Sequence, residues 1–438
     1  MLCYKVLLVI VVLVAIAQQH HIVVAKSIED TGTSIQKESF HFRDVIARLQ
    51  SHTLNILKSF FSIFLNIGKI FNNQQEIVSN QSVEIVDEIV SEQSHENENV
   101  ETINANPVVV PIIDISALIN DGSSYEDRIH VAHQIGNACK NVGFFIIKGH
   151  GVPNEIINEA WDATRSFFNL PLEEKMQYRR PQQEYPFGYN ELGAEILSAG
   201  KAKQSNATTT ALPDLKEMFS LGPSNPDAGF PSRIFAAQPD NFEVAWTNYY
   251  DALTTLASKL FVGFSIALNL PNENFFEEYT THHASALRAL NYPSTEDYVM
   301  QEGQLRASAH TDYGAFTILR SDSAGLQVSK DKDPPAWHDV PYVEDAFVVN
   351  LGDLMQRWTN DEWLSTLHRV INLENIDNSV SSTYSGNKRR QSMAYFHNLN
   401  PDAIVTVLNS ENPKYEPIVA GEFLMQKHLA SIEENKPY

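Results

Sequence analysis

Residues 286–319 read ALRALNYPSTEDYVMQEGQLRASAHTDYGAFTIL, and this stretch opens a series of short apolar runs separated by Gly, Pro and Asp turns. The runs that follow the β pattern after Ala286 are 287–292, 314–319, 326–329, 346–351, 368–373, 390–397 and 404–408. Many short strands of this kind are typical of a sandwich or a double-sheet jelly roll, and they do not suit alternating βαβ units. We therefore expect a mainly β fold with flanking α-helices.

The preceding region is mixed. Apolar residues at strand period predict strands over 108–115 and 143–150, and apolar residues at helical period predict helices over 127–140, 154–169 and 241–267, with a short turn at 172–178. We expect one main domain, made of a mixed α/β region over 108–235 and a jelly-roll region over 236–428.

The N-terminus has the layout of a secretory signal. Lys5 precedes an apolar run over 6–16, which ends in the small-x-small sequence Ala15-Ile16-Ala17. We expect cleavage after residue 17, with a second acceptable site after Ala25, and a secreted or lumenal protein. The alternative is an uncleaved signal that anchors the chain, although the run is short for a membrane span.

Residues 26–105 form an extension with two parts. A helical pattern over 43–71 predicts an amphipathic helix that packs on the main domain or a partner, or lies on a membrane surface. Residues 73–105 hold eight acidic side chains and no Lys or Arg, which is typical of a solvated linker. The sequons at Asn80 and Asn206 are glycosylation acceptors only if the chain enters a eukaryotic secretory pathway.

The overall charge and the cysteine count exclude several classes of protein. The 438 residues carry a net charge of −22, which argues against binding to nucleic acid or to anionic membranes. Two cysteines cannot build a disulfide framework or a Cys-rich zinc site, and we expect Cys139 to be a buried thiol. A monomer is the default expectation.

His310 and Asp312 lie two residues apart in a β context, so both side chains point to one face of the strand. His368 stands at the start of a later predicted strand. Two histidines and one carboxylate are the ligand set of non-haem Fe(II) oxygenases, whereas zinc is more often held in a tetrahedral site. A His-x-Asp pair alone is weak support, because short patterns of this kind arise by chance.

A second pair strengthens the interpretation. Arg390 and Ser392 share one face of a predicted strand, and Ala394 and Phe396 continue that face, which disfavours a surface arginine. A guanidinium binds a carboxylate through two parallel hydrogen bonds. Such a pair suits the far carboxylate of a dicarboxylic co-substrate whose other end chelates iron.

Over residues 108–428 the sequence resembles the iron- and 2-oxoglutarate-dependent dioxygenases of the isopenicillin N synthase-like family. The matching segments occur in order: 110–114, 143–152, 168–175, 214–219 and 287–293, then His310, Asp312, His368 and the Arg390-x-Ser392 motif. The sequence departs from the family in a Ser- and Asn-rich insert between Glu374 and Lys388, and in Leu290, which stands where many plant members have asparagine.

The resemblance implies a double-stranded β-helix (jelly-roll) core and the following roles. His310, Asp312 and His368 hold Fe(II), Arg390 and Ser392 bind 2-oxoglutarate, and Tyr292 donates a hydroxyl to it, with ascorbate as a candidate reductant. The expected reaction is the O2-dependent hydroxylation, desaturation or ring closure of a small-molecule substrate. Two alternatives remain open from the sequence: an iron oxidase or cyclase that uses no 2-oxoglutarate, and a non-catalytic carboxylate-binding protein. Phe316, Trp358 and Tyr189 are weak candidates for substrate contacts, since aromatic residues in such positions are more often core.

Overall fold

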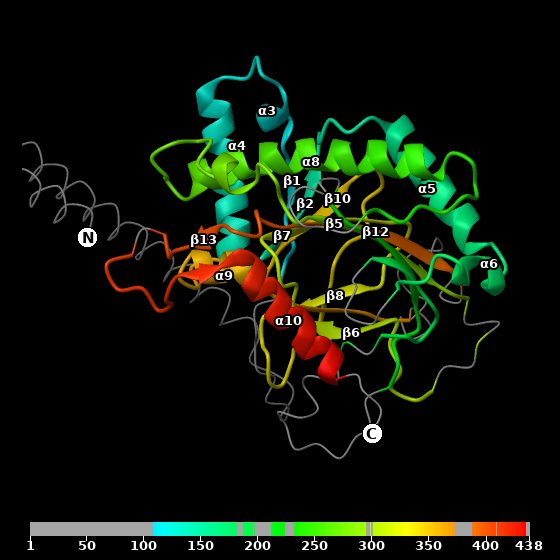
Figure 1. Cartoon of the computed structure of the whole chain (residues 1–438). Coiled ribbons are helices and arrows are strands. Elements are labelled where there is room, and N and C mark those ends of the chain that lie inside the picture. Colours follow the sequence, from blue (N-terminus) through cyan, green and yellow to red (C-terminus); the bar gives the residue numbers. More distant parts are fainter. Residues whose placement is uncertain are drawn as a thin grey trace, which may run out of the picture. The chain divides into compact units, whose positions relative to one another are not determined.

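A computed structural model of the chain describes residues 108–181, 187–195, 197, 212–223, 232–294, 298, 301–372, 388–408 and 410–434 (Figure 1). The predicted signal, the helix over 43–71, the acidic linker, both sequons and the insert over 374–387 lie outside these residues.

Two sheets make up the centre of the described domain. The larger has eight strands in the order β1 (Ile112–Asp114), β2 (Phe144–Lys148), β10 (Phe347–Leu351), β7 (Phe316–Ser321), β12 (Arg390–His397), β5 (Ala286–Tyr292), β4 (Glu217–Leu221) and β3 (Gly188–Asn190). The smaller has four strands in the order β6 (Ala307–His310), β11 (Leu367–Val370), β8 (Leu326–Ser329) and β9 (His338–Asp339). A short pair, β13 (Ile404–Val405) and β14 (Ile418–Val419), completes the strands of this part of the chain.

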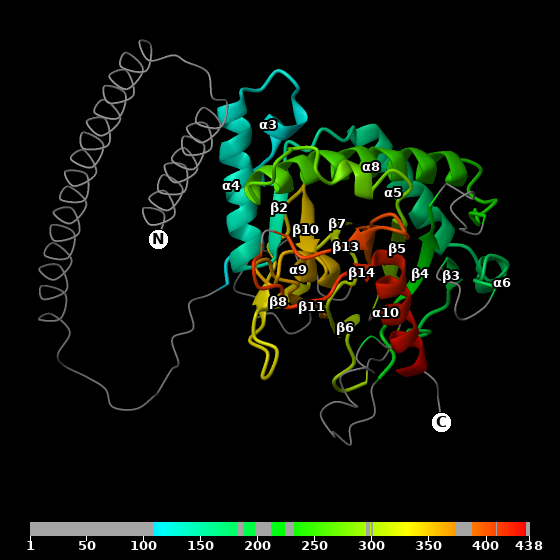
Figure 2. The same ribbon diagram turned by 60° about the vertical axis from the view of Figure 1, so that its left-hand side comes forward.

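The described helices are α3 (Ser116–Ile119), α4 (Tyr125–Asn141), α5 (Asn154–Phe168), α6 (Leu172–Met176), α8 (Phe242–Ala267), the 3-10 turn η2 (Glu277–Tyr279), α9 (Asp353–Trp358) and α10 (Ala420–Glu434). Helices α4, α5 and α8 cover the larger sheet on the side away from the smaller one, whereas α10 lies on the opposite side and lines the cavity with Leu424 and His428 (Figures 1 and 2). Ser124 starts α4, because its hydroxyl accepts a hydrogen bond from the amide of Asp127. Within the described ranges, no helix combines the length and the apolarity that crossing a bilayer requires.

The expected fold class is confirmed: the structure is sheet-rich, with helices flanking a jelly-roll core. The helices predicted over 127–140, 154–169 and 241–267 correspond to α4, α5 and α8, and Cys139 is fully buried, as expected. Two features are not evident from the sequence pattern. β1 and β2 pair in parallel, connected through α3 and α4, and α10 follows the last strand.

The main core lies between the larger sheet and its helices, and aromatic rings dominate it. Phe167 of α5 is fully buried, and its ring lies 4.9 Å from that of Phe219 and 5.5 Å from that of Phe242. Because truncation leaves a cavity as well as losing apolar burial, Phe167→Ala should lower the free energy of unfolding by about 3–5 kcal/mol. Denaturant unfolding measures this, with Val244→Ala, at an exposed position of α8, as the control. An equal effect of both substitutions would contradict this description of the core.

Candidate metal and co-substrate site

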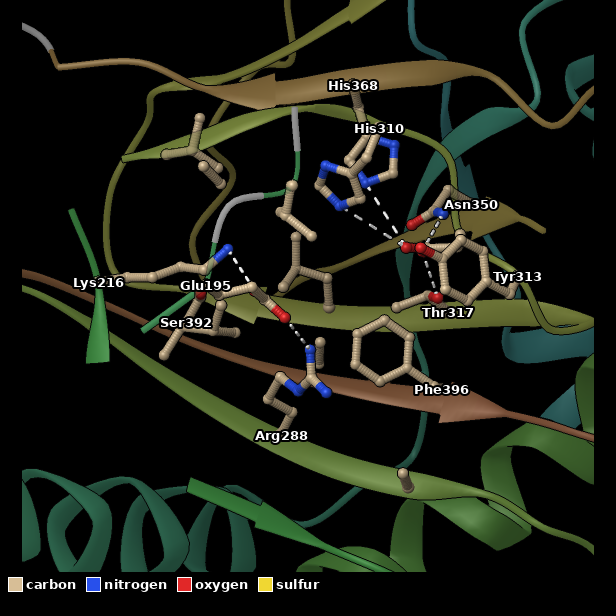
Figure 3. Close-up of a pocket in the computed structure, with 18 of the residues that line it drawn as sticks. Glu195, Lys216, Arg288, His310, Tyr313, Thr317, Asn350, His368, Ser392 and Phe396 are labelled. Carbon is tan, nitrogen blue, oxygen red and sulfur yellow. Dashed lines mark hydrogen bonds and ion pairs between the residues drawn. The ribbon is translucent and has the colours of Figure 1, made fainter. Parts of the chain in front are cut away.

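A cavity of about 260 Å³ lies between the two sheets (Figure 3). Alternate residues of the larger sheet line it, because side chains two apart in a strand share one face. From β12 these are Arg390, Ser392, Ala394 and Phe396, and from β5 they are Ala286, Arg288, Leu290 and Tyr292. The smaller sheet contributes Ala307, His310, Leu326, His368 and Val370.

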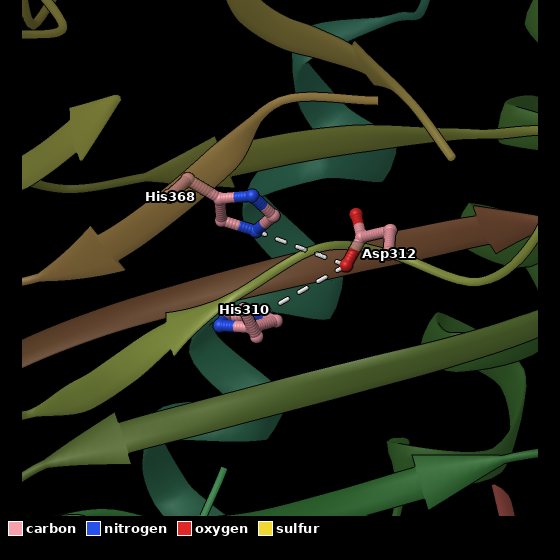
Figure 4. Close-up of side chains that lie close together, drawn as sticks. All are labelled: His310, Asp312 and His368. Carbon is pink, nitrogen blue, oxygen red and sulfur yellow. Dashed lines mark ion pairs between the residues drawn. The ribbon is translucent and has the colours of Figure 1, made fainter. Parts of the chain in front are cut away.

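His310, Asp312 and His368 meet at one place in this cavity (Figure 4). His310 ends β6 and lies directly opposite His368 of β11 in the sheet register. The Nε2 atoms of His310 and His368 lie 3.9 and 3.8 Å from Asp312 Oδ1. One donor atom from each of the three residues lies within 4.8 Å of the others.

Hydrogen bonds fix the orientation of both imidazoles. His310 Nδ1 lies 2.7 Å from the carbonyl of Ser308, and His368 Nδ1 lies 3.1 Å from the carbonyl of Thr366. A carbonyl only accepts hydrogen bonds, so each Nδ1 carries a proton, and Nε2 is the ring nitrogen that faces Asp312. Burial, and then the neighbouring His368, lower the pKa of His310 to about 3, which keeps its ring neutral.

The Asp312 carboxylate is held in the same way. Its Oδ2 accepts hydrogen bonds from Thr317 Oγ1 at 2.6 Å and from Asn350 Nδ2 at 2.7 Å, so Oδ1 faces the two imidazoles. Burial opposes the charge on Asp312, but the two histidines and these hydrogen bonds outweigh it and lower its pKa. Two imidazoles and one carboxylate, each with a supporting hydrogen bond, fit the facial ligand set of Fe(II).

Thr317 offers a test of this support. Thr317→Val keeps the shape of the side chain and removes one of the two donors to Asp312 Oδ2, so Fe(II) affinity should fall by about 10- to 100-fold. Anaerobic Fe(II) titration measures the affinity, with Thr255→Val on the exposed side of α8 as the matched control. Unchanged Fe(II) affinity in Thr317→Val would contradict the supporting role.

Arg390 is the first residue of β12, and its side chain lies on the face of the strand that lines the cavity. Its side chain is 1% exposed, and its Nε donates to the carbonyls of Ser323 and Ala324 at 3.3 and 3.1 Å. Its Nη1 is buried and has no hydrogen-bond partner among the described residues. A buried cationic donor without a partner is costly, so this end of the cavity suits an anion.

Ser392 and Tyr292 lie beside Arg390, as expected. Tyr292 is opposite Arg390 in the register of β5 and β12, and the guanidinium lies 5.1 Å from the centre of its ring. Ser392 is opposite Leu290, and all four residues line the cavity. The structure therefore brings together the six residues that the sequence singled out: His310, Asp312, His368, Arg390, Ser392 and Tyr292.

The aromatic residues considered for substrate contact lie elsewhere. Phe316, Trp358 and Tyr189 are fully buried in the main core and do not line the cavity. A charged group in the cavity wall, formed by Arg180, Glu195, Lys216 and Arg288, was not predicted from the sequence. The strand pattern could have identified Arg288 as a cavity-lining residue, because it alternates with Leu290 and Tyr292 on β5.

Comparisons with known proteins agree with this geometry. The family model for the 2OG-Fe(II) oxygenase superfamily matches residues 282–399, and the model for the N-terminal domain of non-haem dioxygenases in morphine synthesis matches residues 110–242. Homoarginine-6-hydroxylase 2-ODD-233 of Oryza sativa subsp. japonica is 31% identical over 336 residues, which cover 74% of this chain and 97% of that protein. The 2-oxoglutarate-Fe(II) type oxidoreductase hxnY of Emericella nidulans is 32% identical over 76% of this chain and 93% of its own.

A solved structure shows the same similarity. A full-length protein of Neurospora crassa, crystallised in complex with alpha-KG, is 28% identical and superposes with a TM-score of 0.63. The match covers 75% of this chain and 98% of that one.

Proposed function

Since the chain belongs to the 2-oxoglutarate-Fe(II) oxygenase superfamily and is an iron- and 2-oxoglutarate-dependent dioxygenase, we propose that His310, Asp312 and His368 hold its Fe(II). The observation that carries this assignment is the convergence of two imidazole Nε2 atoms and one carboxylate oxygen within 4.8 Å in the wall of the cavity. The Emericella nidulans relative is named for 2-oxoglutarate and the Neurospora crassa protein was crystallised with alpha-KG, which disfavours an oxidase or cyclase that works without 2-oxoglutarate and a non-catalytic binder.

Arg390 and Ser392 bind the far carboxylate of 2-oxoglutarate in this proposal. The unpartnered Nη1 of Arg390 supports it, because a carboxylate there would satisfy a buried donor and neutralise a buried charge. Tyr292 packs its ring against the guanidinium and donates its hydroxyl to the co-substrate.

The protein's own residues supply geometry and a restricted environment. The Nδ1–H groups of His310 and His368 remain on backbone carbonyls, so both Nε2 atoms face the metal position throughout. Apolar side chains from both sheets, Leu290, Leu319, Leu326 and Val370, limit the access of water. When bound, Fe(II) supplies the redox chemistry that couples the consumption of 2-oxoglutarate and O2 to substrate oxidation, with release of succinate and CO2.

Hydroxylation is the reaction that we propose for a small-molecule substrate, since the rice relative is named as a hydroxylase. Succinate formation, measured with and without Fe(II), 2-oxoglutarate and ascorbate against a panel of small metabolites, tests this. We expect succinate to require both iron and 2-oxoglutarate and to rise when the substrate is present. Product formation without 2-oxoglutarate would instead establish the oxidase alternative.

We also propose that the chain enters the secretory pathway on a signal that ends at residue 17, and that the mature protein is a monomer. The apolar run after Lys5 and the Ala15-Ile16-Ala17 sequence support this. N-terminal sequencing of the protein recovered from a eukaryotic culture medium, with light scattering for its mass, is the test. A chain that retains Met1 would contradict cleavage, and retention with the membrane fraction would favour an anchored form.

A further inference from the structure

The segment 214–219, which matches the family in sequence, belongs neither to the iron ligands nor to the co-substrate pair. It begins behind the iron site. Asp214 lies just before β4, and its fully buried side chain contacts β6, the strand that ends in His310. A carboxylate at this place is close enough to an iron ligand to affect the orientation of that ligand.

The pairing of β6 with β11 is interrupted next to His310. His310 lies opposite His368 in the register. Before it, the two β6 residues Ser308 and Ala309 lie across from the single residue Arg369. This arrangement is a β-bulge, which disrupts the strand pairing locally and redirects a side chain. β6 is also an edge strand, with β11 as its one neighbour in the described sheet, so strand pairing alone does not fix Ser308.

Asp214 fixes Ser308 where the strand pairing does not. Its Oδ1 accepts hydrogen bonds from the amide of Ser308 at 2.9 Å and from the hydroxyl of Ser308 at 2.6 Å. The carbonyl of the same serine lies 2.7 Å from His310 Nδ1 and orients that imidazole. Ser308 therefore connects the buried carboxylate to the iron ligand.

The other oxygen of Asp214 has partners of its own. Oδ2 lies 3.1 Å from Lys216 Nζ and accepts a hydrogen bond from the amide of Leu197 at 3.2 Å. Lys216 Nζ also lies 2.8 Å from Glu195 Oε2 (Figure 3). Burial opposes the charge on Lys216, but Glu195 and Asp214 outweigh it and raise the pKa of its ammonium. Because both of its oxygens are held, the Asp214 carboxylate keeps one orientation toward Ser308.

We propose that Asp214 is a positioning residue for the iron site, which acts through Ser308 to keep the imidazole of His310 directed at the metal position. This inference rests on the proposed function, in which His310 is an Fe(II) ligand. Groups that hydrogen-bond to a metal ligand orient it and so raise metal affinity. Asp214 extends this support by one residue beyond the carbonyl of Ser308.

Anaerobic Fe(II) titration of the full chain tests the proposal. Asp214→Ala removes the acceptor of both Ser308 hydrogen bonds. Its Fe(II) affinity should fall by about 10-fold, the lower end of the range for a direct hydrogen-bond partner of a ligand. Asp214→Asn keeps one acceptor oxygen, for which Ser308 and Lys216 then compete, so its affinity should fall less, by about threefold. Denaturant unfolding of the metal-free protein measures how far each variant is destabilised.

Glu217→Ala and Glu217→Gln are the matched controls. Glu217 belongs to the same segment and is buried, and it accepts hydrogen bonds from Lys175, Tyr189 and Asn291. It does not line the cavity and has no printed bond to β6, so its loss should destabilise the fold without changing Fe(II) affinity. A merely structural role for Asp214 would give the same result in both sets of variants.

An unchanged Fe(II) affinity in Asp214→Ala, or an equal loss of affinity in Glu217→Ala, would overturn the proposal. Equal losses in Asp214→Asn and Asp214→Ala would also overturn it, because the acceptor oxygen would then not be what matters. If Asp214→Ala does not fold, Asp214→Asn decides, and an unchanged affinity in that variant refutes the positioning role. Failure of the wild type to bind Fe(II), or retention of iron by His310→Ala, is a separate result that would overturn the proposed function instead.

Discussion

Replacing His310 or Asp312 with alanine is expected to abolish iron binding and 2-oxoglutarate turnover together. Each replacement removes one of three donors and leaves the other two without the geometry that Fe(II) requires. Loss of a residue that hydrogen-bonds to a metal-ligating side chain already lowers metal affinity by about 10- to 100-fold. Loss of the ligating side chain itself should therefore lower Fe(II) affinity by more than about 100-fold. Metal analysis after dialysis and succinate formation measure the two effects.

The matched control is His338→Ala, which removes a histidine from β9 of the same smaller sheet, outside the cavity. This variant should keep iron and turnover at wild-type levels. Retention of iron and turnover by His310→Ala or Asp312→Ala, in a protein that is folded by circular dichroism, would exclude these residues as ligands.

The second large effect is expected at Arg390. Arg390→Gln removes the buried guanidinium whose Nη1 has no partner, so the KM for 2-oxoglutarate should rise by about 10- to 100-fold. Arg390→Lys keeps the charge but loses the planar fork, so its KM for 2-oxoglutarate should lie between those of the wild type and Arg390→Gln. Steady-state succinate formation at varied 2-oxoglutarate measures the change.

Arg389→Gln provides the control for Arg390, because the neighbouring side chain points the other way and hydrogen-bonds to Asn291 and Asn169. It should leave the KM for 2-oxoglutarate unchanged. A similar rise in both variants would mean that the effect comes from disturbance of β12, and an unchanged KM in Arg390→Gln would refute the anchoring role.

Strand periodicity explains why much of the site could be predicted from the sequence. It puts Arg390 and Ser392 on one face with Ala394 and Phe396, and all four line the cavity. The same rule shows why Phe316 could not be a substrate contact. Thr317 and Leu319 of β7 face the cavity, so the side chain of Phe316 points to the opposite face of the strand. Its ring centre lies 5.0 Å from that of Phe261 of α8.

Contacts between distant segments were beyond local patterns. The direct register of His310 with His368 depends on how β6 and β11 pair. Glu195 lies in a loop, Lys216 precedes β4 and Arg288 lies within β5, so their ion pairs exist only because the fold brings three separate segments to one wall. Thr317 and Asn350, which donate hydrogen bonds to Asp312, lie on β7 and β10 of the larger sheet. No local sequence pattern marks them as donors.

A crystal structure of the protein grown anaerobically with Fe(II) and 2-oxoglutarate tests the central claim most directly. We expect one iron bound by His310 Nε2, His368 Nε2 and Asp312 Oδ1, with the far carboxylate of 2-oxoglutarate on Arg390 and Ser392. Iron bound elsewhere, or a co-substrate carboxylate that rests on Lys216 and Arg288, would contradict it.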